Sequence, residues 1–473
     1  MEDAEEEPWM IPPSGRKHDT PIKGPLPATL QVVSANLLYV PSQSLPSGLI
    51  NRLIRLAAFQ NPEFYRAQAM RMSTFGKPRV ISCAEELEHH IALPRGCMAV
   101  LSSLAKSLGI TMQIADKRYD GQPISVSFTG TLSPSQKESV NAVLQHEDGV
   151  VSAPTAFGKT VVAAKIIAER TVNTLIIVHR QQLLHQWRER LAAFLNVELA
   201  TIGQIGGGKK RRTKVIDVAM LQSIHRAGNV DDLVADYGQV VVDECHHVSA
   251  FTFEQVMKQV KARFVLGLTA TPIRKDGHHP IIFMQCGPVR YHLGERDSSA
   301  QSQFTHRVVV RYTDTDTTGP AQDISIHDVY QTLVNDASRT DMIVSDIREA
   351  VNNGRTPLVL TERREHLASL VERLNEITPN VVVMHGGMGV KQRREIAARL
   401  AATPDNAPRI LAATGKYIGE GFDDSRLDML FLTMPISWRG TLQQYAGRLH
   451  RNHQGKKDVV IYDYVDRKIS VTL

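Results

Sequence analysis

Residues 153–160, "APTAFGKT", have the types and spacing of a loop that holds a phosphate. Ala153, Gly158, Lys159 and Thr160 fill the pattern G/A-x-x-x-x-G-K-S/T, and such a loop between a strand and a helix directs backbone N–H groups at an anion. Lys159 would reach the β- and γ-phosphates, and the Thr160 hydroxyl would bind Mg²⁺. The loop is completed by Pro154, Thr155, Ala156 and Phe157. A pattern this short also arises by chance, so the rest of the chain has to agree.

Two carboxylates, Asp243 and Glu244, follow the apolar run "VVV" downstream of this loop. A site for a magnesium–nucleotide complex needs one carboxylate to hold the metal and another to orient and deprotonate the attacking water. Asp243 suits the first task and Glu244 the second. The alternative is a solvated acidic strand end, but the phosphate loop upstream favours catalysis. A nucleotide and Mg²⁺ are therefore expected at this site.

A pair of arginines, Arg448 and Arg451, stands far downstream in "QYAGRLHR". Residues three apart share one face of a helix. A planar guanidinium donates a fork of hydrogen bonds to phosphate. Supplied by a second domain, these side chains would complete the nucleotide site only when two domains close. The alternative is a structural pair on a basic helix.

Composition narrows the class of protein. The 473 residues are too many for one core, and the net charge of +6 is compatible with a nucleic-acid partner. No run approaches the ~18 apolar residues of a membrane span, and the acidic start "MEDAEEEPWM" lacks the apolar core of a signal peptide. The expected location is therefore the cytoplasm, with no membrane partner. The four cysteines are far apart, which argues against zinc and against a disulfide framework.

The pattern along the chain predicts an α/β protein with several domains. Strands alternate with helical segments in two stretches, which is typical of βαβ units and parallel sheets. Before them, a helix is expected up to Gln60, with a break at Asn61–Pro62, and "PISVSFTG" (123–130) reads as a strand. The expected divisions are a mobile segment 1–27, a small mixed α+β accessory domain 28–128, a first α/β domain 129–295, a connector 296–328 containing the strand-like "THRVVVRYT", and a second α/β domain 329–473.

The order "APTAFGKT", "DECHH", "LTATP", "QYAGRLHR" resembles the motifs of superfamily 2 helicases over about residues 129–465. Within that superfamily, the "DECHH" box and "LTATP…RKDGHHP" look most like the XPB-type and phage repair-helicase branch. The strings "NRLIRLAAFQNPEFYRAQAMRM", "HIALPRGC" and "DGHHPIIFMQCGPVR" are similar to the helicase portion of TOTE conflict elements, which couple a primase, a helicase and a nuclease. The sequence shows no primase or nuclease signature, so these enzymes would be partners.

The resemblance implies two tandem RecA-like P-loop domains with the ATP site between them, and it assigns further roles. Gln136, Gly421, Asp423 and Gln444 would contact the nucleotide. His246, Thr269 and Thr271 would couple hydrolysis to movement of the second domain. The nucleic-acid backbone would be bound by polar and basic groups near strand ends, which are also common in ordinary loops. These candidates are Arg180, Gln181, Gln222, Ser223, Arg363 and Thr414. The accessory domain adds basic residues for duplex binding at Arg52, Arg55, Arg66, Arg71, Lys77 and Arg79.

The function implied is an ATP-dependent helicase or translocase, expected to act on DNA and to move 3′ to 5′ along one strand, in a conflict or repair context. Two alternatives stay open. One is a motor that translocates on duplex DNA without separating the strands. The other is a nucleic-acid binding module in which hydrolysis only resets affinity.

Overall fold

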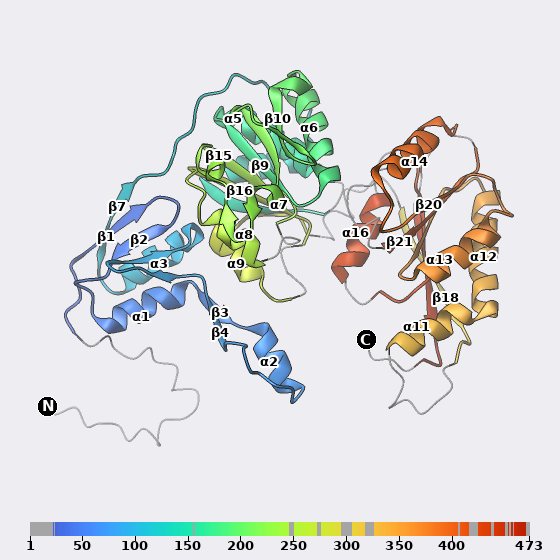
Figure 1. Cartoon of the computed structure of the whole chain (residues 1–473), viewed down its shortest axis with the longest axis horizontal. Helices are drawn as coiled ribbons and strands as arrows, with labels where there is room; N and C mark the ends of the chain where they lie inside the picture. The colour runs from blue at the N-terminus through green and yellow to red at the C-terminus, as the bar shows by residue number, and fades with distance from the viewer. Residues whose placement is uncertain are drawn as a thin grey trace.

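The described part of the chain forms three principal sheets, one in the accessory domain and one in each α/β lobe (Figure 1). The computed structural model describes residues 22, 24–154, 157–245, 250–271, 276–294, 305–316, 326–404, 407–415, 424–436, 439–449, 453, 456 and 458–469. No helix within these ranges is long and apolar enough to cross a membrane.

The accessory domain is built on a five-stranded mixed sheet of order β5-β6-β2-β1-β7. Its strands are β1 (Thr29–Ser34), β2 (Leu38–Pro41), β5 (Glu85–Glu86), β6 (His90–Leu93) and β7 (Thr111–Asp116). Only the pairing of β1 with β7 is parallel, and the other three pairings are antiparallel. Helices α1 (Ser47–Leu56) and α3 (Met98–Ser107) bury Leu49, Leu53, Leu101 and Ala105 in the same core as Leu30 of β1. A small unit with a mixed sheet therefore precedes the two α/β lobes, and its limits as a domain stay a prediction.

Two predictions in this region were wrong in detail. The first helix ends at Leu56 and not at Gln60, because residues 58–60 form strand β3 (Ala58–Gln60), which pairs antiparallel with β4 (Val80–Ser82). The segment "PISVSFTG" is not a strand. It runs along the first lobe, where the Ile124 and Thr129 amides donate to Thr171 O and Phe194 O, and its alternating apolar side chains pack on that lobe's core without a partner strand.

The first lobe contains an eight-stranded sheet of order β11-β10-β12-β9-β15-β16-β8-β17, parallel except for the β10–β11 hairpin. The strands are β8 (Asp148–Ser152), β9 (Thr174–Val178), β10 (Ile202–Gly206), β11 (Lys209–Arg211), β12 (Ile216–Met220), β15 (Gln239–Val242), β16 (Phe264–Thr269) and β17 (Val289–His292). Its main helices are α4 (Pro134–Leu144), α5 (Lys159–Arg170), α6 (Gln181–Leu195), α7 (Leu221–Ile224), α8 (Ala250–Met257) and α9 (His279–Cys286). Both faces of the sheet are covered, since Val240 and Val242 lie in one core cluster and Val241 in another. This arrangement explains the near-continuous apolar strands.

The accessory domain and the first lobe share a single core, because the cluster containing Val240 also contains Leu30 and Leu101. The buried Arg95 guanidinium crosses the junction and donates to the carbonyl oxygens of Val260 and Ala262, at 2.7 Å each. The two units are therefore joined by packing and by hydrogen bonds.

The second lobe has a six-stranded, fully parallel sheet of order β18-β23-β22-β19-β21-β20. The strands are β18 (Thr305–Thr313), β19 (Pro357–Thr361), β20 (Val381–Met384), β21 (Ile410–Thr414), β22 (Met429–Leu432) and β23 (Asp458–Asp466). The helices include α11 (Ile326–Asn335), α12 (Ala337–Asn352), α13 (Arg364–Leu374), α14 (Val390–Ala402) and α16 (Arg439–Leu449). The strand-like "THRVVVRYT", expected in the connector, pairs along its whole length with β23. We therefore propose that the second lobe begins at Thr305.

Candidate nucleotide site

The phosphate loop lies where β8 ends and α5 begins. Helix α5 starts at Lys159, directly after Gly158, whose φ of 88° lies in the left-handed region that favours glycine. A Cβ at Gly158 would also come within 2.5 Å of Gln136 Nε2. The Lys159 ammonium donates to Ala153 O at 3.0 Å, so it points back over the loop. Thr155 and Ala156 lie outside the described residues.

The two carboxylates follow β15 at the carboxyl edge of the sheet. Glu244 Oε1 lies 3.5 Å from Lys159 Nζ, and both side chains are largely shielded from solvent. Glu244 has a φ of 47°, a left-handed conformation that costs about 1–3 kcal/mol in a residue with a Cβ. Its Oε2 accepts from the Ala270 amide at 3.4 Å. The structure thus brings together the lysine and the glutamate that the sequence separates by 85 positions.

Asp243 is almost completely buried beside Glu244. Burial, followed by the negative charge of Glu244, raises the pKa of the Asp243 carboxyl to about 6. The hydrogen bond from Trp187 Nε1 to Asp243 Oδ2, 2.6 Å long, opposes this increase. A carboxylate held in this way gains stability from any cation placed against it.

The oxygen donors of Asp243 and Thr160 fit a Mg²⁺ ion that is also bound by the phosphates of the nucleotide. Among the described residues, no group of three or more His, Cys, Asp or Glu could hold a metal ion. Mg²⁺ is commonly bound through one or two carboxylates together with substrate phosphates and water. Asp243 supplies such a carboxylate, and Thr160 supplies a hydroxyl on the second residue of α5. Assignment of Thr160 and Asp243 to the metal stays a prediction.

Gln136 lies beside the phosphate loop. It is the third residue of α4 and forms a capping box with Ser133, whose amide donates to Gln136 Oε1 at 2.9 Å. Its Nε2 donates to Phe157 O at 2.7 Å, which links the helix to the loop. The Phe157 ring stacks on Tyr291 of β17, with centroids 6.0 Å apart. Recognition of adenine by Gln136 stays a prediction.

The "LTATP" motif connects the loop to the carboxylates. Thr269 ends β16, which lies between β15 and β8, and its carbonyl accepts from the Ala153 amide at 3.0 Å. Its hydroxyl donates to Thr271 O at 2.7 Å and accepts from the Thr271 amide at 3.2 Å. Thr269 is thus held between the phosphate loop and the strand that ends in the two carboxylates. His246, the third coupling candidate, lies outside the described residues.

The nucleic-acid candidates of the first lobe gather near the turn after β10. A Cβ on Gly207 would be 2.7 Å from Gln181 Nε2, and a Cβ on Gly206 would be 2.9 Å from Ser223 Oγ. Arg180 directly precedes α6, which begins at Gln181. Gln222 reaches the same end of the sheet and donates to His179 O at 3.0 Å. Their contact with nucleic acid stays a prediction.

In the second lobe, Thr361 of β19 pairs in register with Thr414 of β21. Arg363 precedes α13, and its guanidinium lies 4.9 Å from the centre of the Tyr330 ring. These two predicted nucleic-acid contacts, Arg363 and Thr414, therefore lie at the carboxyl ends of neighbouring strands. Their role is untested.

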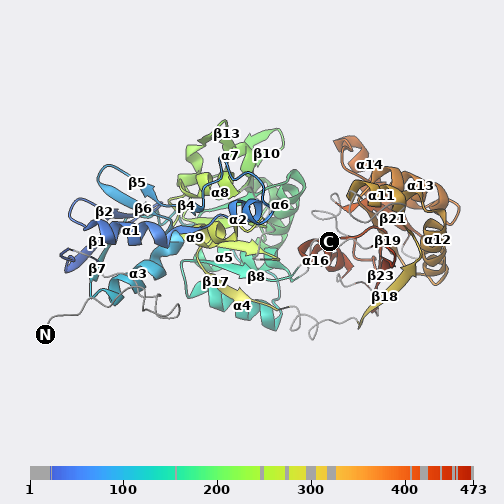
Figure 2. The ribbon, with the colours of Figure 1, turned by 90° about the horizontal axis from the view of Figure 1, so that it is seen from below.

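Arg448 is a partly buried residue of α16, which lies on the side of the second lobe nearer the first in both views (Figures 1 and 2). Gln444 also belongs to α16. Arg451, Gly421 and Asp423 lie outside the described residues. Their catalytic and nucleotide-binding roles stay predictions.

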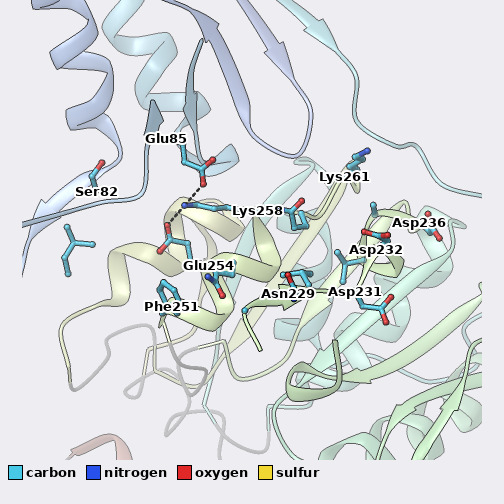
Figure 3. A pocket seen from close by; sticks show the side chains of 17 residues that line it. Ser82, Glu85, Asn229, Asp231, Asp232, Asp236, Phe251, Glu254, Lys258 and Lys261 are labelled. Atoms are coloured by element: carbon cyan, nitrogen blue, oxygen red, sulfur yellow. Dashed lines mark ion pairs between the residues drawn. The ribbon is translucent and has the colours of Figure 1, made fainter. Parts of the chain in front are cut away.

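A separate polar pocket, about 930 Å³ in volume, lies between the base of β4 and the first lobe (Figure 3). The Lys258 ammonium bridges Glu85 of β5 and Glu254 of α8, at 2.9 and 2.8 Å. Asp231, Asp232 and Asp236 also line the pocket. Its largely acidic lining disfavours a polyphosphate.

The sequence offered no reason to expect that Trp187 donates a hydrogen bond to Asp243. Trp187 lies on the buried stripe of α6 with Leu184, Leu191 and Leu195. That spacing indicates a core residue and carries no signal for its indole N–H.

Comparison with known proteins finds similarity to helicases and to a restriction-enzyme family. Residues 129–274 match the family model described as type III restriction enzyme, res subunit. The chain is 26% identical over 363 residues to the "Putative ATP-dependent RNA helicase L396" of Acanthamoeba polyphaga mimivirus, covering 74% of this chain and 66% of that protein. It is 33% identical over 156 residues to the "DNA 3'-5' translocase XPB2" of Sulfurisphaera tokodaii, covering 33% of this chain and 34% of that protein.

The fold agrees with these matches. A fragment of a "putative HsdR subunit of a type I restriction enzyme" from Vibrio vulnificus YJ016 superposes with a TM-score of 0.53 at 20% identity, covering 73% of this chain and 66% of that chain. The motif order and the parallel sheets agree with these relatives, so the chain is similar to helicases and DNA translocases of superfamily 2. Within that superfamily it is similar to XPB proteins and to viral helicases.

Proposed function

We propose that the chain is a DNA helicase that moves 3′ to 5′ along one strand, driven by ATP-dependent closure of its two RecA-like lobes. The observation that carries the proposal is the approach of Lys159 Nζ to Glu244 Oε1, at 3.5 Å, beside the buried Asp243. A phosphate-binding cation, a water-activating base and a metal ligand thereby meet at one strand edge.

In this proposal each side chain has a separate task. Lys159 exchanges its contacts with Ala153 O and Glu244 for the β- and γ-phosphates. That exchange releases the Glu244 carboxylate to accept a proton from the attacking water. Asp243, oriented by Trp187, and the Thr160 hydroxyl hold the metal. Mg²⁺, when bound, neutralises charge on the phosphate oxygens.

The second lobe supplies the charges that complete the site. Arg448 and Arg451 approach the γ-phosphate when the lobes close, while Thr269 and Thr271, with His246, transmit the change from the loop. The polar groups near Gly206–Gly207 in one lobe and at Arg363 and Thr414 in the other hold the nucleic-acid backbone. Alternate closing and opening then moves one lobe past the other along the strand.

A duplex-DNA translocase without strand separation is the second candidate. It is favoured by the relation to a protein named as a DNA translocase. The test compares ATP hydrolysis with single-stranded DNA, duplex DNA, forked DNA and RNA, together with displacement of a duplexed strand and of a triplex-forming strand. Stimulation by DNA with displacement of a duplexed strand supports the helicase, whereas displacement of only the triplex strand supports the translocase. Stimulation by RNA alone contradicts both.

The relative named as an RNA helicase makes the RNA arm of this test necessary. Multiple ATP turnovers during one binding event would exclude the third candidate, a binding module reset by hydrolysis. A primase or nuclease partner, suggested by the TOTE resemblance, stays part of the proposal, and co-purification from the native host tests it.

A further inference from the structure

A narrow arm, residues 58–82, projects from the accessory domain (Figure 1). Its stalk is the antiparallel pair β3–β4, with Ala58 opposite Ser82 and Gln60 opposite Val80. Helix α2 (Pro62–Ala69) and a turn at residues 70–79 form its outer part.

The arm is internally ordered although it is thin. Asn61 links the outgoing and the returning segment of the arm. The Asn61 Oδ1 accepts from the Glu63 amide at 3.0 Å, and the Asn61 Nδ2 donates to Pro78 O at 2.8 Å. Phe64 is buried inside the arm, and the Arg79 guanidinium lies 5.5 Å from the centre of its ring. The tip is therefore presented on a defined scaffold.

The tip exposes large apolar side chains to an unusual degree. Phe75 is 96% exposed, and Met70 and Met72 are 63% and 62% exposed. Folding gains little from burial of these side chains, and several exposed large apolar side chains within six residues point to a binding surface. The turn that holds Phe75 is closed by a hydrogen bond from the Lys77 amide to Thr74 O at 3.1 Å.

The net positive charge of the arm indicates which class of partner it binds. It carries Arg66, Arg71, Lys77 and Arg79, against a single carboxylate, Glu63. Cations bind phosphates without regard to sequence. Exposed Phe and Met side chains can enter or cover a base step, and base–aromatic stacking tolerates every base. The combination is complementary to a nucleic acid whose bases are accessible at the end of a duplex.

The base of the arm contacts the first lobe just beyond the "LTATP" motif. A Cβ on Gly277 would be 2.5 Å from Pro62 Cγ, and the rings of Phe59 and His278 meet edge-to-face with centroids 6.2 Å apart. The arm thus joins the lobe at the segment that enters α9. This contact fixes the arm on the ATP-hydrolysing lobe.

We propose that this arm binds the junction of single- and double-stranded nucleic acid, with Phe75 against the terminal base pair and the four cations on the adjacent backbone. The inference rests on the proposed function, which supplies a motor that pulls one strand toward the arm. When the motor pulls one base out of the duplex, the Phe75 ring takes its place against the next base pair and stacks on it.

The first test compares wild type, Phe75→Ala and Phe75→Trp, with melting temperature as the control for folding. Binding to a forked duplex and unwinding of it should fall about five- to a hundredfold in Phe75→Ala, the loss expected for one base-stacking contact. Phe75→Trp should retain both, and hydrolysis stimulated by single-stranded DNA should stay unchanged in both variants. Unaltered fork binding and unwinding by Phe75→Ala overturns the proposal and points to a protein partner for the tip.

A second test locates the contact directly. All four native cysteines are buried, so Phe75→Cys introduces an accessible thiol, and Ser102→Cys on the exposed face of α3 is its matched control. A fork carrying a thiol-reactive group at the terminal base pair should crosslink to Phe75→Cys and not to Ser102→Cys. Equal crosslinking of the two overturns the assignment. A wild-type protein whose ATP hydrolysis responds to no nucleic acid would instead contradict the proposed function itself.

Discussion

The indole Nε1 of Trp187 donates a 2.6 Å hydrogen bond to Oδ2 of Asp243. This contact joins the middle of α6 to the end of β15, inside the first lobe. Because α6 begins at Gln181, one rigid helix connects a predicted nucleic-acid contact to the predicted metal ligand. A shift of α6 on nucleic-acid binding would therefore move the indole that orients the Asp243 carboxylate.

Replacing Trp187 by Phe should impair metal binding more than folding. The ring still fills the core, but Asp243 loses a donor that lowers its pKa and sets its orientation. Loss of a hydrogen bond behind a metal ligand weakens metal affinity about 10–100-fold. Titration of ATP hydrolysis with Mg²⁺ measures the effect. Leu191→Val, on the same buried stripe, is the control, and an equal change in both variants would contradict the role of the indole.

Lys159→Ala should abolish ATP hydrolysis and sharply weaken ATP binding, because neutral backbone N–H groups cannot replace the point charge on the β- and γ-phosphates. Lys165→Ala is the matched control on α5, since Lys165 pairs with Glu169 one turn away. A partly exposed helical pair of this kind contributes about 0.3–0.5 kcal/mol. Nucleotide binding and turnover measured on both variants check this prediction. Wild-type turnover by Lys159→Ala would remove the loop from the mechanism.

Gly96→Ala should loosen the accessory domain from the first lobe. An added Cβ would overlap the Phe283 carbonyl oxygen, so α9 and the Arg95 segment must separate. Overpacking of this kind costs about 1–3 kcal/mol. Calorimetry should show a lower melting transition, and β7 should exchange its amide hydrogens faster. Gly48→Ala, whose Cβ would meet only Ile22 and come no closer than 3.1 Å, should leave both unchanged. No difference between the variants would contradict a shared core.

His366 should make the second lobe sensitive to acid. It is fully buried and hydrogen-bonded to Thr361, and burial, with a smaller effect from Arg339, lowers its pKa to about 4. The unfolded chain binds this proton below about pH 6.5 and the native state only near pH 4, so stability falls as pH drops through this window. The loss by pH 4 is about 3 kcal/mol. Calorimetry between pH 7 and 5 should show that the stability of His366→Asn falls less with decreasing pH than that of the wild type. An identical slope would contradict the assignment.

The buried strands of both lobes could be predicted because runs such as "TLIIV" and "MLFL" are apolar on both faces. The same reasoning failed for β10, "IGQIG", because two glycines and a glutamine interrupt its apolar pattern. In "PISVSFTG", the alternation of Ile124, Val126 and Phe128 reflects packing on a lobe surface without strand pairing. An alternating pattern shows which side chains are buried. A strand within a sheet and an unpaired extended segment on a lobe surface give the same alternation.

The meeting of Lys159 with Glu244 could be anticipated because the carboxyl ends of parallel strands lie at one edge of a sheet. The left-handed backbone of Glu244 could not be anticipated, since the local sequence contains no glycine there. The junction formed by Arg95 was equally hidden. A buried arginine that donates to two carbonyls about 165 residues away depends on tertiary packing, which no local pattern records.

ATP hydrolysis by Arg448→Ala on DNA, measured beside its melting temperature, tests the two-lobe mechanism most directly. A guanidinium from α16 that neutralises charge on the γ-phosphate would contribute on the order of 10³ to 10⁵ in rate. The account predicts a folded variant that binds ATP within a few-fold of wild type and has lost DNA-stimulated hydrolysis and unwinding, with Arg448→Lys a poor substitute because it lacks the planar fork. A folded Arg448→Ala that hydrolyses ATP on DNA at nearly the wild-type rate would contradict it.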